Sequence, residues 1–254
     1  MVDPASFQEK LSRPGPLLGT CITLNDAIVT EALSDLFDFV WIDTEHNPMP
    51  LDVVQAHVMA TKGSNSAALV RVPANDPNLI KPVLDLGASG VIVPLVRTVD
   101  DVRRAVAACK YPPEGIRGFG PRRAAHYGQR SGPDYIRWAN EHVVCVVQIE
   151  LVEAVDNLAE IVRVPGLTSI VVGPNDLASS MGFPGQPGHP KVKATIEGVA
   201  KLAAEAKMPM GLAWGADEKE IHDWHAKGIK WFSLANDFTL LTGYVKGLAK
   251  RLRG

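Results

Sequence analysis

The sequence has few of the features that mark secreted, membrane-bound or nucleic-acid-binding proteins. Its 254 residues contain only three cysteines, Cys21, Cys109 and Cys145, which are widely spaced in apolar surroundings. We expect them to be reduced thiols rather than disulfide partners or zinc ligands. No apolar run approaches the ~20 residues of a membrane span, and the N-terminus lacks a basic segment followed by an apolar one. The net charge of -2 provides no basic field for nucleic acid. These absences predict a cytoplasmic protein that binds neither membranes nor nucleic acids.

Several catalytic motifs are also missing. The sequence contains neither a Gly-x-Ser-x-Gly elbow nor a glycine-rich phosphate loop followed by Lys-Ser/Thr. The segment from Gly118 to Arg123 has arginine where a dinucleotide fingerprint needs its third glycine. No lysine falls inside an expected strand, since Lys230 only precedes the last one, which argues against Schiff-base aldol chemistry. Any enolate chemistry should therefore be assisted by a metal.

Eight short apolar runs alternate with segments of helical periodicity. The runs are typical of parallel strands that are buried on both faces. We expect strands at Leu17–Cys21, Phe39–Asp43, Ala67–Arg71, Gly90–Pro94, Val143–Ile149, Ser169–Val172, Met210–Trp214 and Trp231–Leu234. Helical patterns between them include Asp52–Ala60, Asp76–Leu86, Val99–Cys109, Leu151–Val162 and Val192–Ala206. Eight such units without a linker predict a single (β/α)8 barrel over residues 1–254 rather than an open doubly wound sheet.

Three further segments bear on how such a barrel binds ligands and partners. The irregular stretches Tyr111–Gly132 and Met181–Pro190 are expected to overhang the carboxyl ends of the strands as substrate loops. The segment Phe238–Leu252 spaces its apolar residues at helical intervals. This apolar stripe needs a partner, either the chain's own barrel or a neighbouring subunit.

Two acids follow strand runs at the barrel end where active sites are found. Glu150 and Asp176 have no cysteine or histidine in their motifs, so any metal site they form is made of oxygen ligands. Such a site favours Mg²⁺, Mn²⁺ or a similar hard ion and leaves positions for water and a chelating substrate. The alternative is that Glu150 caps the helix after it and Asp176 caps its own loop.

A histidine and an arginine also follow expected strands. His46 is a candidate general base that Asp43 would orient, although a histidine in such a loop can simply be a satisfied polar residue. Arg71 needs an anion, which could be the substrate or a neighbouring acid. Glu45 stays unassigned, and Asp85 taken alone is a solvated or capping carboxylate on a helix.

Taken together, these motifs resemble a known family. They are Trp41-Ile-Asp43-Thr-Glu45-His46, Val70-Arg71-Val-Pro73, Tyr111-Pro-Pro-Glu-Gly-Ile-Arg117-Gly118, Gln148-Ile-Glu150 and Gly173-Pro-Asn-Asp176. Their order, from about Leu17 to Leu234, is similar to that of the class II, metal-dependent pyruvate aldolases, which include 4-hydroxy-2-oxoheptanedioate aldolase and 2-dehydro-3-deoxyglucarate aldolase. The resemblance implies a barrel of the phosphoenolpyruvate/pyruvate type, with the C-terminal helix exchanged between subunits in a homohexamer, a trimer of dimers.

The resemblance also implies roles for individual residues. Glu150 and Asp176 would bind the divalent metal, Mg²⁺, Mn²⁺ or Co²⁺. The catalytic residues would be His46 as base, Arg71 as transition-state stabiliser, Asp43, and Asp85 to raise the basicity of His46. Substrate would contact Gln148, Gly173, Pro174, Asn175, Asp176, Arg71 and Leu212. Asn175 replaces an alanine common in the family, and the loop Gly120–Tyr127 has its own pattern, which leaves aldehyde specificity open.

The reaction implied by this resemblance is reversible cleavage of a 4-hydroxy-2-oxo acid to pyruvate, or a related 2-oxo acid, and an aldehyde through a metal-stabilised enolate. Such enzymes serve the catabolism of aromatic or sugar acids. A metal-dependent acyl-CoA lyase of the citryl-CoA or malyl-CoA type is the alternative enzyme, for which Arg117, Arg122 and Arg123 are the only candidate phosphate ligands. A barrel that binds a metal and an oxo acid without catalysis is the alternative from a different class.

Overall fold

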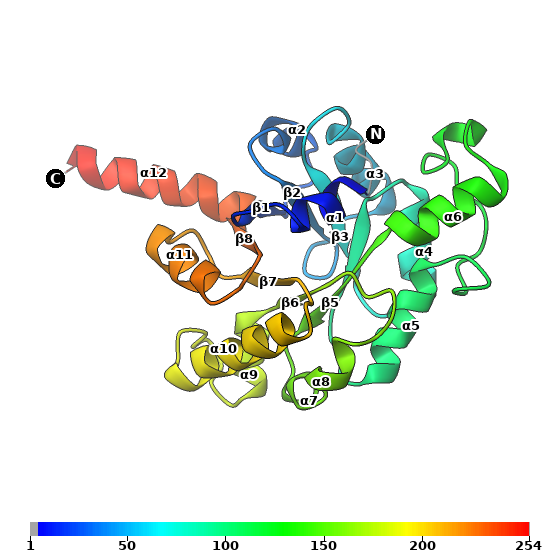
Figure 1. Ribbon diagram of the computed structural model, residues 1–254. Coiled ribbons are helices and arrows are strands. Elements are labelled where there is room, and N and C mark those ends of the chain that lie inside the picture. Colours follow the sequence, from blue (N-terminus) through cyan, green and yellow to red (C-terminus); the bar gives the residue numbers. More distant parts are fainter. Residues whose placement is uncertain (1–4, 254) are drawn as a thin grey trace.

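The computed structural model describes residues 5–253, in which eight parallel strands form a closed barrel (Figure 1). Each strand pairs with the next along the chain, and β8 closes the barrel by pairing with β1. The strands are β1 (Leu17–Ile22), β2 (Phe39–Asp43), β3 (Ala67–Arg71), β4 (Gly90–Val93), β5 (Val144–Ile149), β6 (Ser169–Val172), β7 (Met210–Ala213) and β8 (Trp231–Asn236). The predicted (β/α)8 barrel is therefore confirmed, while the ends of the predicted domain, residues 1–4 and 254, lie outside the described residues.

Helices surround this barrel on its outer side (Figure 1). They are α1 (Ala5–Leu11), α2 (Ile28–Ser34), α3 (Leu51–Ala60), α4 (Pro77–Asp85), α5 (Val99–Cys109), α6 (Gly132–His142), α7 (Val152–Asp156), α8 (Leu158–Ile161), α9 (Pro174–Ser180), α10 (Pro190–Glu205), α11 (Glu218–Ala226) and α12 (Asp237–Arg253), with a 3₁₀ turn at His126–Gly128. Local signals set several helix starts: Asp76 caps α4 before Pro77, and Thr98 and Asp101 form a capping box on α5. The single helix expected at Leu151–Val162 is instead two short helices, α7 and α8, which meet at Asn157.

Side chains alternate between two apolar layers along each strand. One cluster fills the barrel interior and includes Phe39, Leu69 and Val146, with Trp231 packed edge-on against Phe39 at 5.2 Å between ring centroids. The other cluster lies between the strands and the helices. Because successive strand residues point to opposite faces, the inward column of each strand ends in a side chain at the carboxyl end of the barrel. Arg71 is one such residue, two positions after Leu69.

Helix α1 closes the amino end of the barrel. Phe7 packs edge-on against Phe39 and Trp231, with ring centroids 5.7 and 5.9 Å apart. Lys10 is fully buried and donates to the backbone oxygens of Asp38, at 2.8 Å, and Asn65. A ligand pocket in the barrel therefore opens at the carboxyl end.

The prediction that Tyr111–Gly132 overhangs the carboxyl ends of the strands is wrong. The segment follows helix α5 rather than a strand, so it begins at the amino end of the barrel. There Arg117 pairs with Asp85 at 2.6 Å, and Arg123 donates to the Leu86 oxygen at 3.0 Å. The other predicted loop, Met181–Pro190, joins α9 to α10 on the carboxyl side, but none of its residues lines the large pocket described below.

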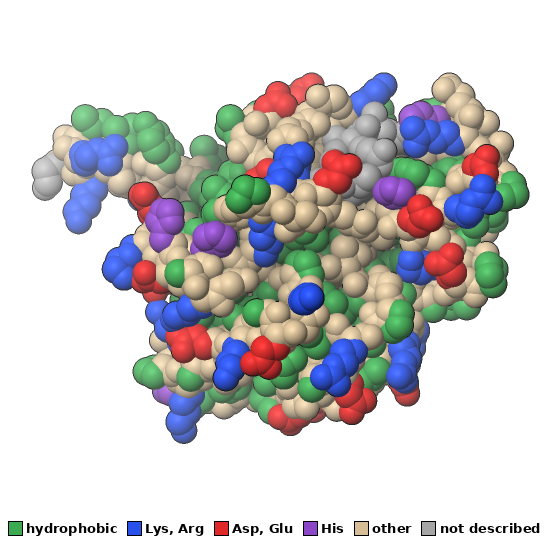
Figure 2. All heavy atoms as spheres, in the orientation of Figure 1, with side chains coloured by type: hydrophobic (Ala, Val, Ile, Leu, Met, Phe, Trp, Pro, Cys, Tyr) green, Lys and Arg blue, Asp and Glu red, His purple; other side chains and the backbone are tan. Residues whose placement is uncertain are grey.

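Helix α12 projects from the barrel as an arm (Figure 1). Its apolar side chains are between 37% and 76% exposed: Phe238, Leu241, Tyr244, Val245, Leu248 and Leu252. Figure 2 shows hydrophobic atoms gathered along this arm. The barrel of the same chain therefore leaves the predicted apolar stripe uncovered. Within residues 5–253, no helix combines the length and the apolar character that crossing a bilayer requires.

Candidate active site

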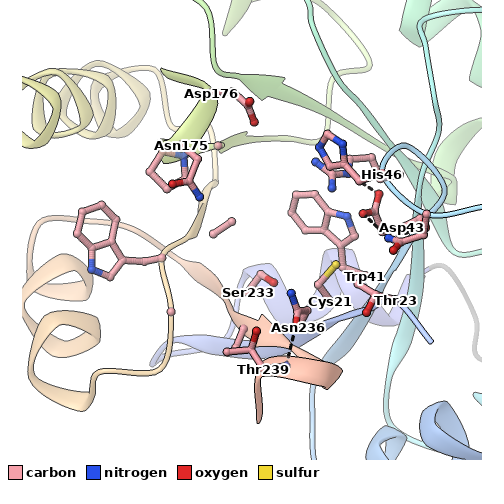
Figure 3. A pocket seen from close by; sticks show the side chains of 18 of the residues that line it. Cys21, Thr23, Trp41, Asp43, His46, Asn175, Asp176, Ser233, Asn236 and Thr239 are labelled. Carbon is pink, nitrogen blue, oxygen red and sulfur yellow. Dashed lines mark hydrogen bonds and ion pairs between the residues drawn. The ribbon is translucent and has the colours of Figure 1, made fainter. Parts of the chain in front are cut away.

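A cavity of about 850 Å³ opens at the carboxyl ends of the strands (Figure 3). Most of the residues predicted for the site line it: Asp43, His46, Arg71, Gln148, Gly173, Pro174, Asn175 and Asp176. They come from β2, β3, β5 and the β6–α9 turn, segments that are distant in sequence. The barrel thus brings the predicted base, cation and acid into one pocket.

Arg71 is held rigidly at the end of β3. Its Nε donates to Asp43 Oδ1 at 2.8 Å, its NH1 lies 3.0 Å from Glu45 Oε2, and its guanidinium lies over the Trp41 ring at 5.2 Å. Burial alone would lower the pKa of Arg71, but the hydrogen bond and charge of Asp43, with the charge of Glu45, raise the pKa above its ordinary value. The side chain is therefore a fixed positive charge that faces the pocket.

Asp43 positions this arginine and not His46, which corrects the predicted pairing. Its carboxylate accepts hydrogen bonds from Arg71, from Asn47 Nδ2 at 2.8 Å and from the Glu45 N–H at 3.1 Å. The acid beside His46 is Glu45, with 3.7 Å between His46 Nε2 and Glu45 Oε2. Strand alternation explains the difference, because Asp43 points into the barrel next to Arg71, while His46 lies three residues beyond the strand with a 61% exposed side chain.

Glu150 is a buried acid directly after β5. Its Oε1 accepts the Leu95 N–H at 2.7 Å, and its Oε2 accepts from Gln148 Nε2. Burial raises the pKa of Glu150 to about 7, and the negative charges of Asp176 and Glu45 add to this rise. The alternative that Glu150 caps the following helix is wrong, because α7 begins without a side-chain cap.

Asp176 lies in the first turn of α9 with its side chain exposed to the pocket. Within the described part of the chain, its carboxylate makes no hydrogen bond or ion pair, so the alternative of a loop cap is not realised. Gly173 leaves room beside Gln148 and Glu150, since a Cβ there would lie 2.6 Å from Gln148 Nε2 and 2.9 Å from Glu150 Oε2. A larger residue would fill the space that the Glu150 and Gln148 side chains face.

These residues fit a divalent metal held by few protein ligands. Glu150 and Asp176 offer only oxygen, and their mutual repulsion is the kind that a bound cation relieves. The buried Oε1 of Gln148 has no hydrogen-bond partner among residues 5–253. Over residues 5–253, no group of three or more His, Cys, Asp or Glu side chains is arranged to hold a metal. Glu150 and Asp176 would therefore have to share the ion with water and substrate.

Two predicted residues lie away from the pocket. Asp85 is the last residue of α4, at the amino end of the barrel, where it pairs with Arg117. A single chain therefore does not bring it to His46. Leu212 is fully buried in the outer apolar layer, because it occupies an outward position of β7, and its neighbour Ala213 lines the pocket instead.

The sequence motifs did not identify the pocket residues that lie on or next to β1, β2, β7 and β8. The pocket is also lined by Cys21, Thr23, Trp41, Trp214, Ser233, Asn236 and Thr239. Cys21, Trp41 and Ser233 belong to the inward columns of their strands, so the two-residue period would have identified all three. The others lie at or beyond a strand end, where the period gives no signal.

A closed parallel barrel with a pocket of acids, a histidine and a fixed arginine at its carboxyl end places the protein in a class, the (β/α)8-barrel enzymes. Comparisons with known proteins give the particular family: residues 22–241 match the model of the HpcH/HpaI aldolase/citrate lyase family. The chain belongs to this family.

The similar proteins span the whole chain. A curated 4-hydroxy-2-oxo-heptane-1,7-dioate aldolase from Salmonella dublin is 37% identical, over 97% of this chain and 94% of the relative. A 2-dehydro-3,6-dideoxy-6-sulfogluconate aldolase from Pseudomonas putida is 36% identical, over 96% and 95%. The crystal structure of a family member from Burkholderia cenocepacia has a TM-score of 0.93 and 31% identity, covering 98% of this chain and all of the other. The predicted family and enzyme class are confirmed.

Proposed function

We propose that this protein is a divalent-metal-dependent aldolase that cleaves 4-hydroxy-2-oxo acids to pyruvate, or a related 2-oxo acid, and an aldehyde. One observation carries the proposal: the Arg71 guanidinium is fixed by Asp43 and Glu45 in the same pocket as Gln148 and the acid Asp176. Aldol cleavage develops negative charge on one substrate oxygen, and a preorganised cation stabilises such charge. The aldolase names of the curated relatives support the same reaction.

The metal would be held by Glu150 and Asp176, and Mg²⁺, Mn²⁺ or Co²⁺ suits their oxygen ligands. When bound, it supplies Lewis-acid polarisation of the 2-oxo group. The Gln148 amide lies beside Glu150 and would contact the 2-oxo acid, together with the turn formed by Gly173, Pro174 and Asn175.

Side chains of the protein transfer the proton and stabilise the charge during bond cleavage. His46 takes the proton from the C4 hydroxyl, the C3–C4 bond breaks to release the aldehyde, and its electron pair becomes the enolate of pyruvate. Arg71 stabilises the negative charge on the C2 oxygen. In the reverse direction His46 takes a proton from C3 of pyruvate. Glu45, 3.7 Å from His46, holds the imidazole toward the pocket.

We also propose that the chain forms a homohexamer, a trimer of dimers, in which α12 is exchanged between subunits. The support is the apolar stripe on α12 that its own barrel leaves exposed. A cytoplasmic location and the absence of nucleic-acid binding stay predictions from composition.

The acyl-CoA lyase is the less supported alternative. Binding the phosphates of coenzyme A needs free basic side chains near the pocket. Arg117 and Arg123 are buried at the amino end and engaged by Asp85 and the Leu86 oxygen. The curated relatives described above are named as aldolases.

The central test is proton exchange at C3 of pyruvate in D₂O, followed by NMR, with pyruvate release from 4-hydroxy-2-oxo acids assayed beside it. The holoenzyme should catalyse both, and EDTA should abolish both until Mg²⁺, Mn²⁺ or Co²⁺ is returned. His46→Ala should lower both rates by about 100-fold or more, while His222→Ala, at an exposed position of α11, should leave them unchanged. Undiminished activity of fully demetallated enzyme would reject the metal site, and tight pyruvate binding without exchange would indicate a non-catalytic barrel.

A further inference from the structure

The pocket has a second half, away from the acids, which we call the distal compartment. It is lined by Thr23, Ser233, Asn236 and Thr239, with Cys21 and Trp214 as apolar walls. Figure 3 shows Asn236 and Thr239 across the pocket from Asp176. If the 2-oxo acid lies against Glu150 and Asp176, the distal compartment is the space left for the aldehyde half of the substrate.

The polar groups of the distal compartment are neutral, and those of Ser233, Asn236 and Thr239 are available to a ligand. Asn236 Oδ1 accepts the Thr239 N–H at 2.7 Å, which fixes the side chain and leaves its Nδ2 group unbonded among the described residues. The hydroxyls of Ser233 and Thr239 likewise have no partner in that part of the chain. Burial raises the pKa of the Cys21 thiol above its ordinary value, so the thiol stays neutral. These side chains suit hydroxyl groups, which both donate and accept.

No positively charged side chain among the described residues is free to pair with an anion in the distal compartment. Among the described residues that line the whole pocket, the only basic side chains are His46 and Arg71, and Arg71 is already held by Asp43 and Glu45. Lys193 contacts the ring of Trp214 but does not line the pocket, and it is paired with Glu220 at 2.7 Å.

A negative charge lies directly behind the compartment. The buried Asp237 carboxylate accepts the N–H groups of Thr23, Leu24 and Phe238 at 2.9, 3.0 and 2.8 Å, and the Thr23 hydroxyl at 2.6 Å. An anionic tail entering here would lose water, gain no counter-ion and meet this charge. A hydroxylated tail would lose water and regain hydrogen bonds.

From this placement we infer that the aldehyde half is uncharged and hydroxylated, so that the substrate is a sugar-derived 4-hydroxy-2-oxo acid without a second acidic group. This inference rests on the proposed aldolase function and narrows it. It separates the chain from its relatives named for a heptane-1,7-dioate and a sulfogluconate, whose names carry an acidic group at the far end.

A matched pair of aldehydes tests the inference. Glyceraldehyde and tartronate semialdehyde differ in that a terminal hydroxymethyl group is replaced by a carboxylate. In the aldol addition of pyruvate by the holoenzyme, we expect kcat/KM to be at least about tenfold higher for glyceraldehyde. The carboxylate of tartronate semialdehyde would lose its hydrogen bonds to water without gaining a partner, and a loss of ~1.4 kcal/mol corresponds to a factor of ten. Equal or higher kcat/KM for tartronate semialdehyde would overturn the inference.

Exchange at C3 of pyruvate separates this failure from failure of the proposed function, because it needs no aldehyde. If the enzyme catalyses this exchange but prefers the carboxylated aldehyde, only the inference of an uncharged aldehyde half is rejected. Absence of exchange rejects the aldolase itself.

A gain-of-charge variant tests the location. Thr239→Arg places a cation at the rim of the compartment and should shift the ratio of the two kcat/KM values toward tartronate semialdehyde by about fivefold or more. Asn65→Arg, at an exposed position at the amino end, makes the same charge change and should leave the ratio unchanged. If the ratio of the two kcat/KM values is the same in Thr239→Arg and in the wild type, the aldehyde half does not bind in the distal compartment. Because the ratio of the two kcat/KM values is compared, a general loss of activity in the variant cancels out. The comparison of the two aldehydes with the wild-type enzyme tests the inference even if the variant does not fold.

Discussion

Glu150 is the residue at which stability and function oppose each other. It is 1% exposed, and its carboxylate faces the like charges of Asp176 and Glu45. Among the described residues, only the Leu95 N–H, the Gln148 amide and the more distant Arg71 compensate its charge. A buried acid without a full set of partners destabilises the fold when it ionises, so its presence is explained by what it binds.

The pH dependence of stability follows from this residue. In the metal-free protein the pKa of Glu150 rises from the ordinary 4.5 to about 7. The contribution of Glu150 to the free energy of unfolding is therefore fully present below about pH 4.5 and is lost as the pH rises through 7. The reason is that the unfolded chain releases the Glu150 proton at a lower pH than the folded chain does. Relative to wild type, Glu150→Gln should gain up to about 3 kcal/mol in free energy of unfolding between pH 5 and pH 8.

Urea unfolding in EDTA at the two pH values measures this difference. Glu153→Gln, an exposed position on α7, is the matched control and should show no such trend. A pH-independent effect of Glu150→Gln would contradict the prediction. Added Mg²⁺ should stabilise the wild type at pH 8 and should not stabilise Glu150→Gln.

At the residue scale, position at a strand end predicted most of the site. Arg71, Glu150 and Asp176 could be predicted because a charged residue at the end of a buried strand, or within a few residues after it, lies at the carboxyl end of the barrel. The partners of these residues could not be predicted, because a shift of one position reverses the direction of a side chain in a strand. This reversal accounts for Leu212, and the contacts of Asp43 depend on the register between β2 and β3.

At the element scale, the junction of β8 with α12 is a concentrated point of stabilisation. Asp237 begins α12 and accepts four hydrogen bonds: three from Thr23 and Leu24, which tie the helix to the loop after β1, and one from the N–H of Phe238 in the same helix. Asp237→Ala removes the carboxylate that accepts all four hydrogen bonds and leaves their donors unpaired. We expect the free energy of unfolding to fall by about 2–4 kcal/mol, whereas Asp156→Ala, at an exposed position on α7, should change it by less than about 0.5 kcal/mol. Equal effects in chemical denaturation would contradict this role.

Strands were easier to predict than the segments between them. The buried strands have continuous apolar runs, a signal that depends only on local sequence. The unit between β4 and β5 contains two helices, α5 and α6, so the segment Tyr111–Gly132 connects helix to helix at the amino end. Assuming one loop and one helix per unit placed this segment at the wrong end. Helix α1 was missed because the role of Phe7 depends on Phe39 and Trp231, which are distant in sequence.

At the scale of the whole molecule, α12 predicts assembly. Its exposed apolar stripe is larger than isolated surface residues would produce, and such patches mark contacts between proteins. Sedimentation should give a species six times the 27.4 kDa of one chain. Leu241→Asp combined with Tyr244→Asp should produce smaller species, while Lys250→Asp, on the opposite side of the helix, should not. A wild-type monomer, or a double variant that stays hexameric, would contradict the prediction.

Along the barrel axis, the inward-facing residues of the strands fall into two groups: those that pack in the apolar interior and those that face the pocket. Inward residues such as Leu69 and Trp231 form the apolar interior, and the last one or two inward residues of a strand, such as Cys21, Ala213 or Ser233, face the pocket. Libraries intended to change the choice of aldehyde can therefore be confined to these terminal inward positions. The tightly packed interior that keeps the barrel folded would then stay unaltered, so most members of such a library should survive expression and heating.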